Sequence, residues 1–115
     1  MTIRILHNPR CSKSRATLAL LQERGIDPEI VLYLENPPDA SELQTILGQL
    51  GLSARDLMRK GEAEYREQGL ADDSLTQQQL ITAMAAHPRL IERPIVLANG
   101  RAAIGRPPES VLSIL

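Results

Sequence analysis

The stretch that decides the fold is Ile3-Arg4-Ile5-Leu6-His7-Asn8-Pro9-Arg10-Cys11-Ser12-Lys13-Ser14-Arg15. Its first four residues are mostly aliphatic and favour a short buried strand, whereas an apolar-periodic segment typical of a helix begins after Cys11. A strand that leads through a loop into a helix places Cys11 at the helix N-terminus, where unpaired N–H groups and the helix dipole favour a thiolate. Most single cysteines are inert, small buried hydrophobes. The polar and basic loop around Cys11 instead predicts a reactive thiol.

Length and composition narrow the class of protein. A chain of 115 residues suits one compact domain, which we expect over residues 1–115. With 13 Lys and Arg against 14 Asp and Glu, there is no overall basic field for nucleic acid or an anionic membrane. Tyr33 and Tyr65 are the only aromatic residues, which disfavours single-stranded nucleic-acid binding by base stacking.

The sequence favours the cytoplasm and no bound metal. The first six residues are too short for a signal peptide, and no apolar run approaches the length of a membrane span. One cysteine cannot form an internal disulfide, and Cys11 with His7 and His87 is too small a set for a typical structural zinc site. We therefore expect a cytoplasmic protein with no membrane partner, no metal and no other bound cofactor.

The N-terminal part of the chain predicts a strand–helix–strand unit. Residues 3–6 form the first expected strand, residues 12–23 a helix that ends near Gly25, and residues 29–34 a second buried strand. Such a unit joins two parallel strands by a right-handed connection.

The middle of the chain is helical in pattern. Asp39 followed by Glu42 resembles a capping box, and apolar residues recur at helical spacing until Gly51. A short helix over residues 53–59, with Ser53 as its candidate cap, is expected next. A partly helical surface segment over residues 61–69 follows. Ser74 or Thr76 begins a further helix that ends before Pro88. The acidic side chains of this region are interpreted as a solvated surface; they are Glu62, Glu64, Glu67, Asp72 and Asp73.

The C-terminal part predicts a hairpin and a last helix. Asn99-Gly100 separates two apolar-rich runs, 95–98 and 101–104, which is a strong hairpin signal. We expect a cis bond at Arg93-Pro94 and a final helix through residues 109–115, with Pro107 or Pro108 in its first turn. The whole order predicts an α/β, thioredoxin-like fold: a mixed sheet of about four strands flanked by helices, with a helical insertion at 39–87 between strands 2 and 3.

Five further side chains are candidates for anion chemistry around Cys11. The hydroxyl of Ser14 could bond the thiolate, or Ser14 is an ordinary first-turn serine. His7 either favours the thiolate as a cation or hydrogen-bonds the loop, and the second interpretation is the simpler. A planar guanidinium suits tetrahedral oxyanions because it donates two parallel hydrogen bonds. The alternative for each arginine is an ordinary surface charge; the three are Arg59, Arg93 and Arg106.

The chain resembles the glutaredoxin-dependent arsenate reductase family essentially from end to end. The resemblance rests on the motifs His7-Asn8-Pro9, Tyr33-Leu34-Glu35-Asn36-Pro37-Pro38, Leu57-Met58-Arg59-Lys60, Glu92-Arg93-Pro94-Ile95-Val96 and Gly105-Arg106-Pro107. Around the cysteine, the well-established members carry Ala-Cys-Gly-Thr-Ser. Arg10-Cys11-Ser12-Lys13-Ser14 is similar to a variant branch of the same family.

The resemblance implies a thioredoxin-like enzyme of arsenical resistance that reduces arsenate, or a related small oxyanion, with glutathione as co-substrate and glutaredoxin as partner. It implies that Cys11 is the nucleophile, that His7 and Ser14 tune the thiolate, and that the oxyanion is bound by Arg59, Arg93 and Arg106. Two alternatives stay open. One is an Spx-like regulatory binding module, although Ser14 stands where its Cys-x-x-Cys switch has the second cysteine. The other is a general glutathione-linked thiol oxidoreductase.

Overall fold

The computed structural model describes residues 2–115, and the chain divides into two compact units. The first unit consists of the segment up to Asn36 together with Arg93–Leu115, and the second is Pro37–Glu92. The predicted helical insertion at 39–87 falls inside the second unit. That residues 1–115 act as a single domain stays a prediction. Within residues 2–115, no helix is both long enough and apolar enough to cross a membrane.

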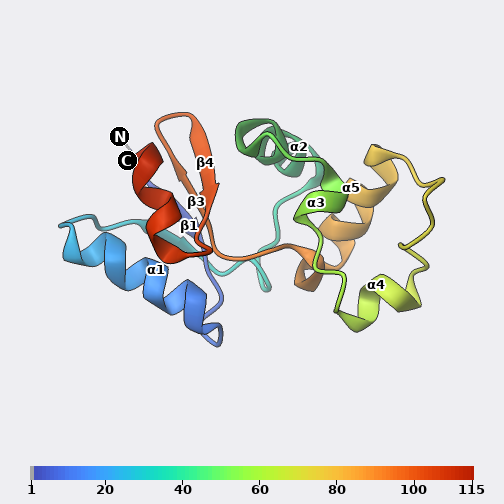
Figure 1. Ribbon diagram of the computed structural model, residues 1–115, viewed down its shortest axis with the longest axis horizontal. Coiled ribbons are helices and arrows are strands. Elements are labelled where there is room, and N and C mark those ends of the chain that lie inside the picture. The colour runs from blue at the N-terminus through green and yellow to red at the C-terminus, as the bar shows by residue number, and fades with distance from the viewer. Residues whose placement is uncertain (1) are drawn as a thin grey trace. The chain divides into compact units, whose positions relative to one another are not determined.

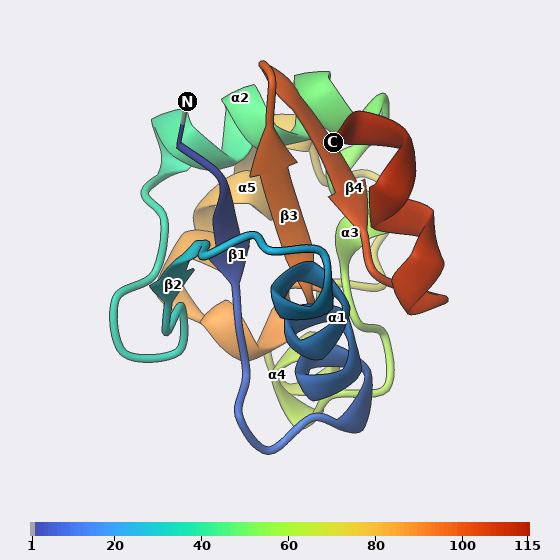
Figure 2. The same cartoon turned by 90° about the vertical axis from the view of Figure 1, so that its left-hand side faces the viewer.

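The first unit contains the four-stranded mixed sheet that the sequence predicts (Figure 2). Its strands lie in the order β2-β1-β3-β4 and are β1 (Arg4–Leu6), β2 (Glu29–Val31), β3 (Ile95–Ala98) and β4 (Arg101–Ile104). β1 is parallel to β2 and antiparallel to β3, and β3 forms the Asn99-Gly100 hairpin with β4. The positive φ of both turn residues, 57° and 71°, is the geometry that an Asn-Gly turn supplies at low cost.

One face of this sheet is covered by α1 (Ser12–Glu23) and by the 3-10 helix η2 (Pro108–Ile114) (Figure 1). The core between these layers is aliphatic, as the near absence of aromatic residues requires. Its fully or almost fully buried members are Ile5, Leu21, Val96, Ala98, Val111 and Ile114. The strand–helix–strand unit therefore holds the start of α1 against a rigid core.

One predicted element of the first unit, the second strand, is wrong in detail. The second strand was expected to be buried over 29–34, yet it ends at Val31 and Ile30 is 46% exposed. β2 is an edge strand, and the chain turns directly after it because the N–H groups of Glu35 and Asn36 both donate to Leu32 O. The predicted final helix is present as the 3-10 helix η2, with proline in its first turn, as expected.

The second unit is a cluster of helices (Figure 1). It comprises α2 (Ala40–Leu50), α3 (Ala54–Leu57), α4 (Ala63–Glu67), α5 (Gln77–Ala86) and the 3-10 helix η1 (Pro88–Leu90). α5 packs against α2 and α3. Three of these helices begin with complete capping boxes at Asp39, Ser53 and Thr76. The structure thus confirms the first two predicted starts and selects Thr76 over Ser74 for the third.

Gly105 lies at a point of close packing, which makes it sensitive to substitution. A Cβ at this position would contact Thr17 Oγ1 and would lie 2.8 Å from Pro94 Cγ. Thr17 is fully buried and its hydroxyl donates to Lys13 O at 2.8 Å, so its side chain has little room to move. We expect Gly105→Ala to lower the free energy of unfolding, measured by urea denaturation, by about 1–3 kcal/mol.

Gly48→Ala is the matched control for this prediction. Gly48 lies inside α2, and a Cβ there would meet nothing within 4 Å. Alanine in a helix interior is favoured over glycine by about 0.5–1 kcal/mol, so this variant should be as stable as the parent or more so. Equal stability of the two variants would contradict the close packing at Gly105.

Candidate active site

Cys11 occupies the N-cap position of α1, as the sequence predicts. Its backbone is extended, with φ −95° and ψ 123°, and its carbonyl accepts the first bond of the helix from the N–H of Arg15 at 3.0 Å. No side chain caps this helix start, and its first turn contains no acidic residue. The first N–H groups of an α-helix have no partner within the helix. The thiol, which is 8% exposed, therefore stands where a negative charge is favoured.

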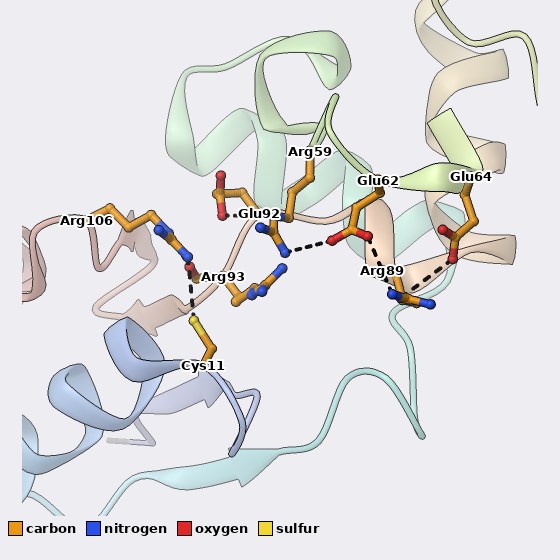
Figure 3. Close-up of polar contacts among 8 residues, drawn as sticks. All are labelled: Cys11, Arg59, Glu62, Glu64, Arg89, Glu92, Arg93 and Arg106. Atoms are coloured by element: carbon orange, nitrogen blue, oxygen red, sulfur yellow. Dashed lines mark hydrogen bonds and ion pairs between the residues drawn. The ribbon is translucent and has the colours of Figure 1, made fainter. Parts of the chain in front are cut away.

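Arg106 is the cation that the structure places against the sulfur (Figure 3). Its Nη2 donates to Cys11 Sγ at 3.5 Å, and its Nε donates to the backbone carbonyl of Arg93 at 2.8 Å. The second bond fixes the plane of the guanidinium, which thereby presents another N–H edge to the thiol. This contact joins residues 95 positions apart in the chain, and both belong to the first unit.

Arg93 contributes to the site through its backbone. Its carbonyl accepts the hydrogen bond from Arg106, and the Arg93-Pro94 bond is cis, which confirms the prediction. The Arg106-Pro107 bond is also cis, which the sequence analysis did not anticipate. Binding of an oxyanion by the Arg93 side chain stays a prediction.

Ser14 and His7 form a buried hydrogen-bonded pair beneath the loop. Ser14 is fully buried and His7 is 6% exposed. The N–H of Asn8 donates to Ser14 Oγ at 3.0 Å, and Ser14 Oγ is hydrogen-bonded to His7 Nδ1 at 2.6 Å. The structure thus favours the interpretation that His7 hydrogen-bonds the loop, and tuning of the thiolate by either residue stays a prediction.

The neighbouring groups keep His7 neutral. Burial lowers the pKa of His7 below its usual value of 6.5, and the positive charge of Arg15 lowers it further. A neutral ring is the form that can accept at Nδ1 from Ser14. The lowered pKa thus favours the neutral ring over the cationic form of His7.

This lowered pKa predicts a pH dependence of stability. Because the unfolded chain takes up a proton on His7 near its usual pKa while the folded chain resists it, the free energy of unfolding falls as the pH drops below about 6.5. His7→Asn removes the titration. We expect the loss of stability between about pH 7.5 and about pH 5, measured by urea denaturation, to be smaller in this variant than in the parent. An equal loss of stability in the parent and in His7→Asn would contradict a lowered pKa of His7.

The loop before Cys11 is held by contacts that the sequence analysis did not foresee. Asn8 Oδ1 accepts from the N–H of Arg10 at 3.0 Å, and Asn8 O accepts from the N–H of Cys11 at 3.0 Å. Arg15, expected only as nearby charge, donates from Nη1 to Pro9 O at 2.9 Å. The Asn-Pro sequence, typical of a turn, was the available signal for the role of Asn8.

Arg59 belongs to the second unit and has its own set of partners (Figure 3). Its Nη1 lies 3.0 Å from Glu62 Oε1, and its Nε lies 3.6 Å from Glu92 Oε1. Its backbone is also fixed, since its N–H donates to Leu90 O at 2.7 Å. The predicted convergence of Arg59 with the residues around Cys11 stays a prediction.

The expectation that the acidic residues of this region form a solvated surface is wrong for two of them. The side chains of Glu62 and Glu64 are only 20% and 19% exposed, and both form ion pairs with arginines. Glu67, Asp72 and Asp73 are exposed, as expected. Arg59 and Glu62 lie between α3 and α4, outside any helix, so the helical spacing rule gave no signal for this pairing.

Metal-binding geometry is not found in the part of the chain that the structure describes. Within residues 2–115, no group of three or more His, Cys, Asp or Glu side chains is placed to hold a metal ion. That the protein works without a metal or a bound cofactor stays a prediction.

Known proteins resemble this chain in sequence and in structure. A sequence profile described as the ArsC family matches residues 6–114. Uncharacterized protein YfgD of Escherichia coli K12 is 60% identical over 98% of this chain and 96% of its own length. An arsenate reductase of Neisseria meningitidis serogroup A is 57% identical over 98% of this chain and 97% of its own length. The solved structure of an arsenate reductase from Vibrio cholerae has a TM-score of 0.97 and 53% identity, covering 100% of this chain and 98% of that chain. These likenesses confirm the predicted fold class.

Proposed function

The chain belongs to the ArsC family, and we propose from this premise that it is a cytoplasmic enzyme that reduces arsenate to arsenite with glutathione and glutaredoxin. The observation that supports the proposal most is the 3.5 Å contact between Arg106 Nη2 and Cys11 Sγ at the start of α1. A thiol between a guanidinium and a helix N-terminus can become a thiolate and can have an oxyanion bound beside it.

The first proposed step is a condensation. The thiolate of Cys11 attacks arsenic(V), a bond forms between sulfur and arsenic, and one oxygen of arsenate leaves as water after protonation. Arsenic keeps its oxidation state in this step. Arg106 stabilises the negative charge on the arsenate oxygens, because charged N–H donors bind an oxyanion more strongly than neutral ones.

The remaining steps need thiols from outside this chain, since Cys11 is its only cysteine. Glutathione attacks the arsenic of the adduct, a second sulfur–arsenic bond forms, and another oxygen leaves as water. The glutaredoxin thiolate then attacks the glutathione sulfur. A mixed disulfide forms, and the electron pair of the broken sulfur–arsenic bond stays on arsenic, which becomes arsenic(III). Water hydrolyses the bond between Cys11 and arsenic, which releases arsenite and restores the Cys11 thiol. A second glutathione reduces the mixed disulfide, so two glutathione thiols end as one disulfide. In this scheme the side chains of Arg59 and Arg93 help to bind the oxyanion, and His7 and Ser14 hold the loop that carries Cys11.

A coupled assay tests the substrate. Purified protein is given glutathione, glutaredoxin, glutathione reductase and NADPH, with either arsenate or a small glutathione-reducible disulfide as oxidant. We expect NADPH consumption above the background without the protein for arsenate, and its loss when glutathione or glutaredoxin is omitted. Turnover of the disulfide alone would favour the general thiol oxidoreductase over arsenate reduction. Turnover of neither oxidant would favour a binding module and contradict the proposal.

A further inference from the structure

The guanidinium of Arg59 is held on two of its three nitrogens by carboxylates (Figure 3). Glu62 pairs with Nη1 at 3.0 Å and Glu92 pairs with Nε at 3.6 Å. A guanidinium is planar and carries five N–H donors in fixed directions, so two contacts on different nitrogens set the orientation of its plane. The contacts of Arg59 with the two carboxylates thus run through Nη1 and Nε.

Glu62 is itself fixed by a second arginine. Arg89 Nη2 lies 3.6 Å from Glu62 Oε2, and Arg89 Nε lies 3.7 Å from Glu64 Oε2. Glu62 is the N-cap residue of α4, yet its side chain makes no capping hydrogen bond. Its carboxylate therefore bridges two arginines instead of stabilising its own helix.

Glu92 is placed beside Arg59 by the backbone. Met58 forms an isolated antiparallel bridge with Ile91, and the N–H of Glu92 donates to Leu57 O at 3.0 Å. The side chains of Arg59, Glu62 and Glu92 are only 24%, 20% and 28% exposed. The pairs are consequently better shielded and better fixed than ion pairs between two fully solvated side chains.

An open cavity adjoins the held guanidinium. Its volume is about 510 Å³, and its lining includes Arg59, Lys60, Glu62 and Glu92. The space is large enough for a small tetrahedral oxyanion. Two basic residues, Arg59 and Lys60, line the cavity together with three acidic ones, Asp56, Glu62 and Glu92. Two of the three acidic residues are the ones paired with Arg59.

We propose that Glu62 and Glu92 are positioning residues that orient Arg59, so that its Nη2 edge faces the bound oxyanion. The two carboxylates act through Arg59 and do not touch the oxyanion. This inference rests on the proposed function for the role of Arg59. It adds that the fixed orientation of the Arg59 guanidinium, and not only its charge, contributes to the affinity for the oxyanion.

Alanine and glutamine substitutions separate position from charge. Glutamine keeps an oxygen that can accept from Arg59 but removes the negative charge, which would otherwise repel an anion. Alanine removes both. If the carboxylates position Arg59, then Glu62→Ala and Glu92→Ala weaken oxyanion binding, whereas Glu62→Gln and Glu92→Gln bind at least as tightly as the parent.

The test is the dissociation constant for arsenate, measured by calorimetry in a Cys11→Ser background so that no covalent step contributes. We expect each alanine variant to raise the constant about three- to fivefold. Glu67→Ala, an exposed change in the same helix, is the matched control and should leave the constant unchanged. In an added Arg59→Ala background, the two glutamate-to-alanine changes should have no further effect.

Three results would overturn the proposal: an unchanged constant in both alanine variants, glutamine variants as weak as the alanine variants, or an undiminished effect without Arg59. Sulfate is titrated in parallel to separate this inference from the proposed function. If sulfate but not arsenate binds, the substrate is wrong, and the sulfate constants decide the positioning role. If Arg59→Ala leaves both anions equally well bound, the role of Arg59 and this inference fail together.

Discussion

Cys11→Ser abolishes arsenate reduction on this account, with a loss of at least about a thousandfold in rate. A serine hydroxyl is almost fully protonated at neutral pH and is a poor nucleophile without a general base. Arg106, whose Nη2 donates to Cys11 Sγ, has no acceptor atom and cannot serve as that base. Arsenite formed per unit time, quantified directly, measures the effect.

The structure indicates that Cys11→Ser removes the nucleophile without disturbing the fold. Serine differs from cysteine by one atom, and the 8% exposed side chain of Cys11 lies in a loop held by hydrogen bonds of its backbone. The unfolding midpoint in urea should therefore change little. Arsenite formation in Cys11→Ser at a rate close to that of the parent would show that another group attacks arsenic.

Arg106→Ala has the second largest expected effect. The substitution removes a charged donor to Cys11 Sγ and, on the proposed mechanism, a donor to the oxyanion. Hydrogen bonds to charged groups contribute about 1.5–3 kcal/mol each, which corresponds to a loss of about 10- to 150-fold in kcat/KM. Alkylation of Cys11 by iodoacetamide at neutral pH should also become slower, because the positive charge beside the sulfur is removed.

Two further variants show what Arg106 contributes. Arg106→Lys keeps the charge but lacks the planar fork that reaches both Cys11 Sγ and Arg93 O, so its activity should lie between those of the parent and Arg106→Ala. Arg101→Ala removes an exposed arginine from β4 and should behave like the parent. Equal activity of Arg106→Ala and Arg101→Ala would place Arg106 outside the reaction.

Local signals explain why much of the fold could be predicted. The boundaries of α1, the capping boxes at Asp39 and Ser53 and the Asn99-Gly100 hairpin are each specified within a few residues. The exposure of β2 could not be predicted, because Ile30 belongs to an apolar run that is typical of a buried strand. Only the order of strands in the sheet makes β2 an edge strand.

In the candidate site, too, the contacts between residues far apart in the chain could not be predicted. The helix start identified Cys11, but its contact with Arg106 depends on how the two ends of the first unit pack together, and sequence spacing carries no information about that distance. Ser14 was considered as a partner of the thiolate, yet its hydroxyl is engaged by His7 and Asn8. Composition alone predicts that Glu62 is an exposed surface charge. Its partner Arg59 also pairs with Glu92, which lies far along the chain, so the sequence does not reveal that these three side chains meet.

The most direct test of the central claim, that Cys11 begins a reduction which external thiols complete, is the ratio of arsenite formed to NADPH consumed in the coupled assay. The account predicts one arsenite for each NADPH in the parent protein, since two electrons reach arsenic in each cycle, and neither arsenite formation nor arsenate-dependent NADPH consumption in Cys11→Ser. NADPH consumption without matching arsenite, or an unchanged ratio and rate in Cys11→Ser, would contradict it.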